Sequence, residues 1–412
     1  MELLLQTNFI YKNELNTENF SRMLRNPTQS YKFYWLEAIL TLMQITDEDL
    51  SFDSILDEMI CAAWHSVVNY HLHLGPSING KVDNNLEHAV KILVDDCDVD
   101  KNSSKESILL AIRQNKKILY SDKKYLARHV PYRLLSPFLN EIGGNDALWN
   151  QKTKLIQYLK EVDAVTPLPY LIVDGPLLEK KVRINPHWRQ FILDNYSVIR
   201  SWIQLKKVRF LQDRNPGVPG IIYKLEEHSA SVRKLNQARE LWKKVAQVSG
   251  EPLRDIYTGL VLEGGQFDLD HFIPWSYVTN DELWNLTPID RRLNSSKGNK
   301  LPKWDTYFRS LAASQYFLYQ MIFSKELVRQ QFENCRRDNV NAVWAAQSLY
   351  VEGNSEERFK NILAHNLRPV YESALLQGYE LWHFSDAPGV AANVDLTFNP
   401  EAEGFYLAAE KK

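Results

Sequence analysis

Residues 268–274 read Asp-Leu-Asp-His-Phe-Ile-Pro, and the clearest chemistry of the chain begins there. Two short motifs follow: Trp-Asn-Leu at residues 284–286 and Leu-Asn-Ser-Ser-Lys-Gly-Asn at residues 293–299. Asp270 and His271 supply a hard-metal ligand and a general base in adjacent positions. Asn294 can supply a second oxygen ligand, because an amide carbonyl coordinates Mg²⁺ well. The sequence therefore predicts a site that combines a metal ion with a base.

The segment around the acid and histidine predicts two strands and a helix. Residues 255–259 and 266–270 are the expected strands, and Gly264 and Gly265 supply the turn between them. Asp268 and Asp270 would then share one face of the second strand, because side chains alternate along a strand. A short helix is expected near Asn294, which gives the order strand, strand, helix.

These motifs resemble the ββα-metal motif of the HNH endonuclease superfamily. That motif has an acid and a histidine before an apolar-Pro segment, then a central Asn-Leu, then a final Asn followed by Lys and Gly. The resemblance covers about residues 255–302, and the order and spacing of the motifs are especially similar to the HNH domain of RNA-guided CRISPR nucleases. The chain shows no split RuvC-type segments around the motif and no flanking zinc-binding cysteine pairs.

The resemblance implies a phosphodiesterase that uses one metal ion. His271 would be the general base that takes a proton from the attacking water, a role suited to a side chain that titrates near neutrality. Asp270 and Asn294 would hold the ion against the scissile phosphate and the leaving 3′ oxygen. This all-oxygen ligand pair favours Mg²⁺ or Mn²⁺ over Zn²⁺.

The resemblance gives roles to three further residues. Asn285 would be the central asparagine that ties the loop to the site and orients His271. Lys297 would contact a phosphate. Asp268 would support the metal or only form a salt bridge, and of these two the salt bridge is favoured.

Positive charge is concentrated directly before the site, although the formal net charge of the chain is only -2. Residues 179–250 contain about fifteen Lys and Arg against six acids. A helix expected over residues 229–247 carries the cations on its outward face: Arg233, Lys234, Arg239, Lys243 and Lys244. This face could lie along a phosphate backbone, and a merely solvated face explains it equally well. The position beside the site favours nucleic acid.

Composition indicates a globular protein of two or three domains, since 412 residues at 44% hydrophobic can bury a large core. No apolar run is long enough to cross a membrane, and the first residues carry an acid where a secretory signal needs positive charge. We therefore expect a cytoplasmic location. Cys61, Cys97 and Cys335 are too widely spaced for a zinc site or a disulfide framework.

Two other metal hypotheses are weaker. Cys61, His65, His71 and His73 could converge, but histidines near helix ends more often only bond to the backbone. The acidic segment at residues 95–104 lacks the central glycine and the closing glutamate of a calcium loop. A solvated loop is the better prediction there.

Apolar periodicity predicts helices over most of the chain, for example at residues 30–43 and 51–70, with a small hairpin within residues 167–184. After the motif, helices are expected at residues 325–337, 340–350, 356–364 and 369–382. We expect a mostly α fold with an embedded ββα-metal (HNH) nuclease motif. The predicted parts are a helical amino-terminal domain (1–165), a basic, mainly helical connector (166–250), the motif (251–303), a helical carboxy-terminal region (304–386) and a tail (387–412).

The predicted function is metal-dependent cleavage of DNA, by nicking or by cutting both strands through dimerisation. Large HNH proteins with helical extensions suggest by association a role in bacterial defence against foreign DNA, with a partner protein of the defence system. Two alternatives stay open: a sequence-specific restriction or homing nuclease, and a non-catalytic nucleic-acid-binding subunit. The intact set of Asp270, His271 and Asn294 argues against a degenerate motif that only binds.

Overall fold

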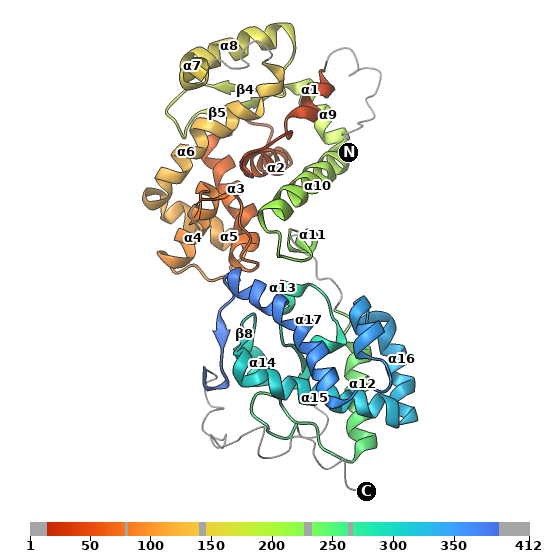
Figure 1. The fold of residues 1–412 in the computed structure, drawn as a ribbon. Helices are drawn as coiled ribbons and strands as arrows, with labels where there is room; N and C mark the ends of the chain where they lie inside the picture. Colours follow the sequence, from red (N-terminus) through yellow and green to blue (C-terminus); the bar gives the residue numbers. More distant parts are fainter. Residues whose placement is uncertain (1–14, 79–80, 140–145, 226–232, 263–266, 387–412) are drawn as a thin grey trace. The chain divides into compact units, whose positions relative to one another are not determined.

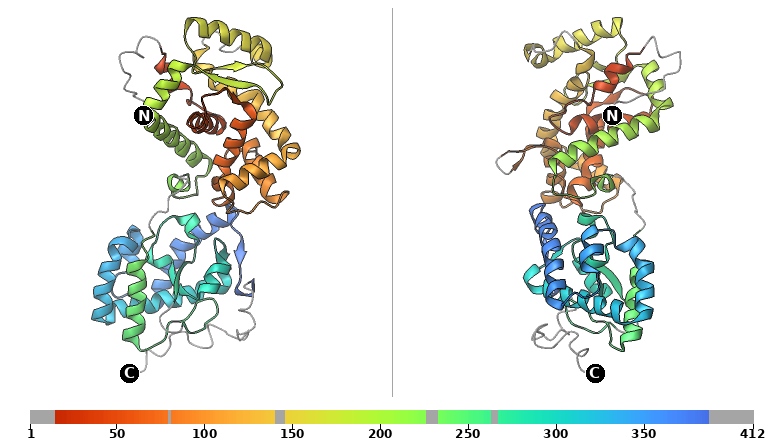
Figure 2. Two further views of the ribbon diagram at one scale, coloured as in Figure 1. Left: turned by 180° about the vertical axis from the view of Figure 1, so that it is seen from behind. Right: turned by 45° about the vertical axis from the view of Figure 1, so that its right-hand side comes forward.

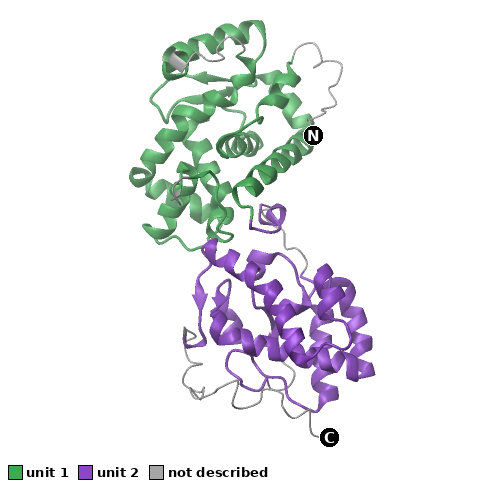
Figure 3. Ribbon diagram, viewed as in Figure 1, with its two compact units in different colours: residues 1–216 green, residues 217–412 purple. Residues whose placement is uncertain are grey.

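The computed structural model describes the chain except for residues 1–14, 79–80, 140–145, 226–232, 263–266 and 387–412. It is mostly helical, as predicted, and it divides into two compact units, residues 1–216 and 217–412 (Figure 3). Residues 166–216 of the predicted connector belong to unit 1 and its remainder to unit 2. The predicted tail and the Gly264-Gly265 turn lie outside the described residues.

Unit 1 is formed mainly by helices (Figure 1). The helices are α1 (Thr17–Arg22), α2 (Tyr31–Met43), α3 (Phe52–Val68), α4 (Asn85–Asp95), α5 (Lys105–Gln114), α6 (Lys116–Leu134), α7 (Asp146–Asn150), α8 (Lys152–Val165), α9 (Pro186–Asp194) and α10 (Tyr196–Arg214). The strands are β1 (Leu50–Ser51), β2 (Ser77–Ile78), β3 (Lys81–Val82), β4 (Tyr170–Val173) and β5 (Lys181–Ile184).

Helix α2 lies in the core of unit 1. Its side chains Phe33, Tyr34 and Trp35 are buried although they follow one another in sequence, because apolar residues occupy most of the circumference of this helix. Helices α3, α6 and α10 pack against it. Figure 1 shows α2 almost end-on, and Figure 2 shows the same unit from two further directions.

The hairpin predicted within residues 167–184 is present. Strands β4 and β5 pair antiparallel with Tyr170 opposite Ile184, and β1 adds to the other edge of β5. Ser51 is the N-cap of α3, and its hydroxyl accepts a hydrogen bond from Ser54 N at 3.0 Å. The two-residue β1 was missed because so short a strand has no periodicity.

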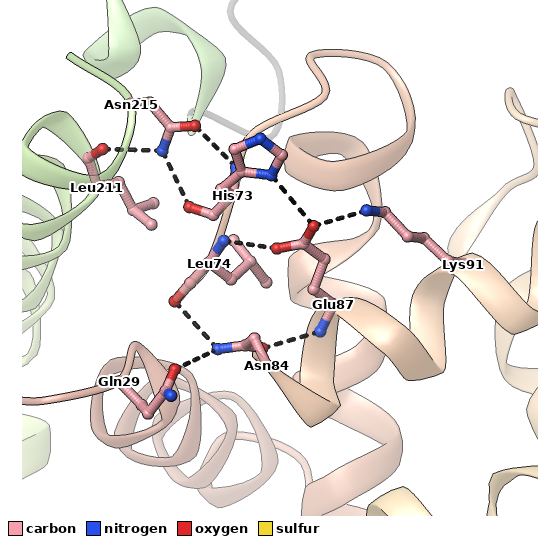
Figure 4. A network of polar contacts seen from close by, with 8 residues as sticks. All are labelled: Gln29, His73, Leu74, Asn84, Glu87, Lys91, Leu211 and Asn215. Atoms are coloured by element: carbon pink, nitrogen blue, oxygen red, sulfur yellow. Dashed lines mark hydrogen bonds and ion pairs between the residues drawn. The ribbon is translucent and has the colours of Figure 1, made fainter. Parts of the chain in front are cut away.

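A network of buried polar groups fixes the segment between α3 and α4 (Figure 4). The carboxylate of Glu87 accepts hydrogen bonds from Leu74 N at 2.8 Å and Lys91 Nζ at 2.7 Å, and it lies 3.3 Å from His73 Nδ1. Asn84 donates to Leu74 O at 3.1 Å and to Gln29 Oε1 at 2.9 Å. These contacts hold the chain before α4 in a defined conformation.

The network also explains the histidines that suggested a metal site. Asn215 accepts from His73 N at 2.8 Å and donates to His73 O at 2.9 Å, while His65 Nδ1 lies 3.0 Å from Asn69 Oδ1. Across the residues that the structure describes, no three His, Cys, Asp or Glu side chains are grouped to hold a metal ion.

Unit 2 contains the predicted motif and the helices around it. Its helices are α11 (Ile221–Lys224), α12 (Asn236–Ser249), α13 (Trp275–Val278), α14 (Arg291–Lys297), α15 (Trp304–Ser324), α16 (Glu326–Asn339) and α17 (Glu356–Leu376). Its strands are β6 (Asp268–His271), β7 (Leu286–Ile289), β8 (Leu301–Pro302) and β9 (Leu381–Trp382). Helices α12, α15 and α16 pack together (Figure 1), and α15 packs against β7.

Two predictions for unit 2 were wrong. Residues 255–259 form a turn closed by an isolated bridge between Arg254 and Val261, and β6 pairs instead with β7. Helix α17 runs without interruption through Pro369, where two helices were expected. The helix expected at residues 340–350 is present but shorter, over residues 343–349, and its segment Ala345–Leu349 is π-helical.

No helix in the described part of the chain is both long enough and apolar enough to cross a membrane. Cys61, Cys97 and Cys335 are all free thiols.

Candidate active site

Two strands and a helix carry the predicted site residues. Strands β6 and β7 pair antiparallel, with Asp268 opposite Ile289 and Asp270 opposite Thr287. Helix α14 follows β7 directly, and its N-cap Asp290 accepts a hydrogen bond from Arg292 N at 2.8 Å. The short link through this cap places the face of α14 against β6.

A buried carboxylate connects the turn before β6 to the start of α14. Asp255 Oδ1 accepts from Tyr257 N at 2.7 Å and Thr258 N at 3.1 Å, and its Oδ2 accepts from Asp290 N at 3.0 Å. Burial raises the pKa of Asp255 to about 7, and the nearby Asp270 acts in the same direction. The turn closes at Gly259, whose φ of 73° is in the left-handed region that glycine adopts without strain.

Asp270 is buried and both of its carboxylate oxygens are bonded. Tyr257 Oη donates to Oδ2 at 2.6 Å, and Lys297 Nζ donates to Oδ1 at 2.9 Å. The same ammonium donates to the carbonyl of His271 at 2.7 Å. Burial lowers the pKa of Lys297, and the Asp270 carboxylate opposes this shift. Lys297, predicted to contact a phosphate, therefore has protein partners for its charge in the interior.

His271 pairs with a carboxylate that the sequence did not indicate. Its Nε2 lies 2.9 Å from Asp281 Oδ1, and both side chains are buried. The other oxygen of Asp281 accepts from Lys234 N at 2.7 Å. Burial by itself raises the pKa of Asp281, but the hydrogen bonds from His271 and the Lys234 amide outweigh it and hold the pKa below its ordinary value.

This pairing fixes the tautomer of the imidazole. An ionised carboxylate can only accept, so the proton of His271 lies on Nε2 and its Nδ1 carries the lone pair. Within the described residues, Nδ1 has no hydrogen-bond partner. A neutral imidazole held in this way can accept a proton at Nδ1.

Asn285 holds the chain that leaves β6. Its Oδ1 accepts from Ile273 N at 2.8 Å and its Nδ2 donates to Ile273 O at 2.9 Å, while Phe272 N donates to the Asn285 carbonyl at 2.9 Å. Buried Asn285 thus fixes the backbone of Phe272 through its main-chain carbonyl and that of Ile273 through its side chain.

The loop between β6 and β7 is also held by the helices that follow the motif. Glu282 accepts from Asn341 N at 2.9 Å and Ala342 N at 3.2 Å. Gln315 of α15 donates to the carbonyls of Leu283 at 3.2 Å and Leu286 at 2.7 Å. The position of Asp281, and through it that of His271, therefore depends on residues well beyond the motif.

Asp268 and Asn294 are the predicted metal ligands that lie nearer the surface. Asn294 Nδ2 donates to Asp268 Oδ2 at 3.2 Å, and the Asp268 side chain is 25% exposed. Their oxygens are hard donors of the kind that Mg²⁺ and Mn²⁺ prefer. Asp268 Oδ1 also lies 3.8 Å from Arg291 Nε, which is the salt bridge favoured for this residue in the sequence. Asp270 shares their face of β6 by strand alternation, but Tyr257 and Lys297 already bond to it.

The predicted basic face is partly neutralised. Lys234 Nζ lies 2.9 Å from Asp338 Oδ1, and Lys243 Nζ lies 2.8 Å from Glu240 Oε1. Arg239 donates to the carbonyl of Phe267, immediately before β6, so it serves the fold. Of the remaining two cations, Arg233 lies over the ring of Trp275 and is close enough to Asp281 to help lower the pKa of that carboxyl. Lys244 bonds to Gln247.

The structure thus brings together Asp268 with Asn294, and Asp270 with Lys297, but it pairs the His271 side chain with neither set. Tyr257 and Asp281 contact these residues and were missed. For Tyr257 the available signal was the Asp-x-x-Thr-Gly sequence at residues 255–259, because Asp and Gly at this spacing are typical of a turn. For Asp281 there was no such signal, because Asn280 and Asp281 before the Trp-Asn-Leu motif indicated only a loop.

This site lies in a segment with a recognisable family signature. Residues 254–303 match the family described as HNH endonuclease. The chain therefore carries an HNH-family motif, as the sequence predicted, and such a motif indicates nuclease activity. No curated protein matches the chain, and no solved structure matches it.

Proposed function

We propose that this protein is a metal-dependent HNH endonuclease that hydrolyses phosphodiester bonds in DNA. The observation that carries the proposal is the pairing of His271 Nε2 with Asp281 at 2.9 Å inside the family-matched segment. It leaves Nδ1 as the basic atom, and a buried histidine with a fixed tautomer suits a general base. His271 takes a proton from water, whose oxygen attacks phosphorus as the bond to the leaving 3′ oxygen breaks.

The strands β6 and β7 with helix α14 serve as the ββα-metal arrangement in this proposal. Asp268, Asp270 and Asn294 would hold Mg²⁺ or Mn²⁺, which when bound would stabilise negative charge developing on the phosphate. Asn285 is a positioning residue that fixes the chain after His271. Lys297 is a second positioning residue, because its ammonium bonds both to Asp270 and to the His271 carbonyl.

DNA is the proposed substrate because the cations nearest the motif form a surface on α12 and the residues before it. Arg233, Lys243 and Lys244 are the proposed contacts, since Lys234 and Arg239 are bonded to other parts of unit 2. We also propose a cytoplasmic defence effector that acts with a partner protein. A plaque assay tests the defence role by comparing cells that express the wild type with cells that express His271→Ala. Equal numbers of phage plaques on both would contradict it.

Plasmid cleavage tests the catalytic proposal. Purified protein is incubated with supercoiled plasmid and Mg²⁺ or Mn²⁺, alongside His271→Ala and a control, His365→Ala, which replaces an exposed histidine of α17. We expect cleavage by the wild type and the control, a loss of at least about 100-fold in His271→Ala, and none with a chelator. Equal activity of wild type and His271→Ala would refute the assignment of the base.

The products separate the proposal from its alternatives. Discrete bands would favour a restriction or homing nuclease, and a smear would favour degradation. Binding of plasmid without cleavage, at any metal tested, would support a non-catalytic nucleic-acid-binding subunit. A parallel incubation with single-stranded RNA determines whether DNA is the preferred substrate.

A further inference from the structure

Unit 1 contains a pocket of about 390 Å³ that is separate from the HNH motif. It lies between the chain leading into α2 and the carboxy-terminal half of α6. Lys32, His129 and Arg133 contribute cationic or potentially cationic groups to its lining, and the described residues of this lining include no Asp or Glu. Its volume is within the range of about 300–1,000 Å³ that is typical of small-molecule sites.

The cations around this pocket have no charged partner among the described residues, although the guanidinium carbon of Arg133 lies 4.4 Å from the centroid of the Trp149 ring. In the part of the chain that the structure describes, no carboxylate pairs with Lys32, His129 or Arg133. Burial lowers the pKa of Lys32, and repulsion from Arg133 adds to this. Burial also lowers the pKa of His129, and Lys152, Arg133 and Arg128 act in the same direction. Like charges held together without a counter-charge favour the binding of an anion.

The start of α2 adds a second favourable element. This thirteen-residue helix has no acidic residue in its first turn, and its N-cap side chain forms no capping hydrogen bond. The hydroxyl of that N-cap residue, Ser30, is buried and has no hydrogen-bond partner among the described residues. The amide of Phe33 already donates to Ser30 O at 3.0 Å, but the helix dipole at such a terminus still attracts phosphate groups. Tyr31 and Lys32, the first residues of α2, line the pocket.

Aromatic side chains lie beside the cations. Tyr125 is 46% exposed, and its ring centroid lies 4.7 Å from that of His129 and 6.4 Å from that of Tyr31. An exposed ring face of this kind can stack on a nucleobase. Gln29, at the pocket edge, is held by Asn84 in the polar network of unit 1, so this edge is already formed (Figure 4).

We propose that this pocket binds a nucleotide, with its phosphates among Lys32, His129 and Arg133 at the start of α2 and its base against Tyr125. Phosphate oxygens supply the missing negative charge, and arginine and lysine are suited to bind them. The phosphates have two sources, a free nucleotide or the 5′ end of a nucleic-acid strand. The proposal is independent of the nuclease function of unit 2.

Calorimetric titration of the full chain without divalent metal tests this proposal. The probes are ATP, inorganic tripolyphosphate and a 5′-phosphorylated oligothymidylate. Lys32→Gln and Arg133→Gln should each weaken ATP binding at least about tenfold, because each removes charge-assisted hydrogen bonds. The matched control is Lys117→Gln, an exposed lysine of α6 outside the pocket, which should bind as the wild type does.

Tyr125→Ala separates the phosphate and base contributions. It should weaken ATP at least about fivefold and leave tripolyphosphate unchanged, because a base–aromatic stack contributes about 1–3 kcal/mol. The oligonucleotide is titrated against Lys243→Glu/Lys244→Glu protein, so that the basic face of unit 2 does not contribute. Tighter binding of the oligonucleotide than of ATP would identify a strand end as the source of the phosphates.

Two results would overturn the proposal. One is the absence of binding by all three probes, and the other is binding that Arg133→Gln leaves unchanged. Misfolding does not confuse the test, because Arg133 is exposed and its replacement should preserve the helical circular dichroism signal and the melting temperature.

Discussion

Lys297 Nζ lies 2.9 Å from Asp270 Oδ1, with the lysine side chain fully buried and the aspartate side chain only 5% exposed. This ion pair joins the last turn of α14 to β6, and the same ammonium bonds to the carbonyl of His271. A lysine that in sequence suggests a phosphate contact is thus part of the interior that positions the site.

Lys297→Met should destabilise the protein strongly. The variant leaves the Asp270 carboxylate buried without its cation, and breaking a buried pair in this way costs about 3–5 kcal/mol. Urea unfolding of the full chain, followed by circular dichroism, measures the decrease in stability. The double variant Asp270→Asn/Lys297→Met removes both charges and should recover much of it. A decrease below about 1 kcal/mol in the single variant would contradict the structural role.

Asp281→Asn should lower plasmid cleavage about 10–100-fold while the fold is kept. Both oxygens of Asp281 accept hydrogen bonds, from His271 and from the Lys234 amide, and asparagine offers only one oxygen. It must turn its NH₂ group toward one donor, which disturbs either the tautomer of His271 or the loop. The control is Asp338→Asn, which alters only the surface partner of Lys234. Equal cleavage rates of Asp281→Asn and Asp338→Asn would show that Asp281 has no role in catalysis.

Asp255 should make the stability of unit 2 depend on pH. Its pKa of about 7 in the folded chain is above the ordinary value of about 3.9, so between these pH values the folded chain holds a proton that the unfolded chain releases. Stability therefore falls as pH rises through this window, by about 1.4 kcal/mol for each pH unit. Asp255→Asn should lack this contribution. Denaturant titrations at pH values of about 5 and about 7 compare the two proteins, and identical changes in stability would refute the shift.

Charge reversal on α12 should weaken DNA binding. Lys243→Glu/Lys244→Glu removes two proposed phosphate ligands, so the slope of log K against log salt should fall by about 0.9 for each phosphate that is no longer neutralised. The matched control is Arg358→Glu/Lys360→Glu on α17, which changes net charge equally. Fluorescence anisotropy with a labelled duplex at several salt concentrations measures both. If affinity falls equally in the two double variants, net charge and not this face accounts for binding.

The local pattern of apolar residues predicted helices such as α2. It failed at residues 255–259, where alternating side chains suggest a strand. There the carboxylate of Asp255 accepts the amides of Tyr257 and Thr258 and turns the chain. The strand that pairs with β6 instead begins at Leu286, beyond an intervening loop, and no short-range signal reports a pairing of that range.

At the candidate site, too, the local sequence predicted some residues and missed those whose contacts depend on tertiary structure. The order of Asp270, His271, Asn285 and Asn294 was sufficient to predict the motif that the family match confirms. Asp281 was missed because its contact with His271 is set by tertiary structure, through a loop whose composition indicates only a turn. The burial of Lys297 was likewise invisible, since a lysine at a helix end is usually exposed.

The anchoring of the β6–β7 loop has a consequence for inheritance. Glu282 accepts hydrogen bonds from backbone amides that follow α16 in the chain. Gln315 of α15 donates to one carbonyl of the loop and to one of β7. Residues 254–303 transplanted alone would leave these groups buried or solvated without their partners. The motif in this protein therefore cannot be moved to another protein by itself. Helices α15 and α16 and the chain after them must be inherited and diversified together with it.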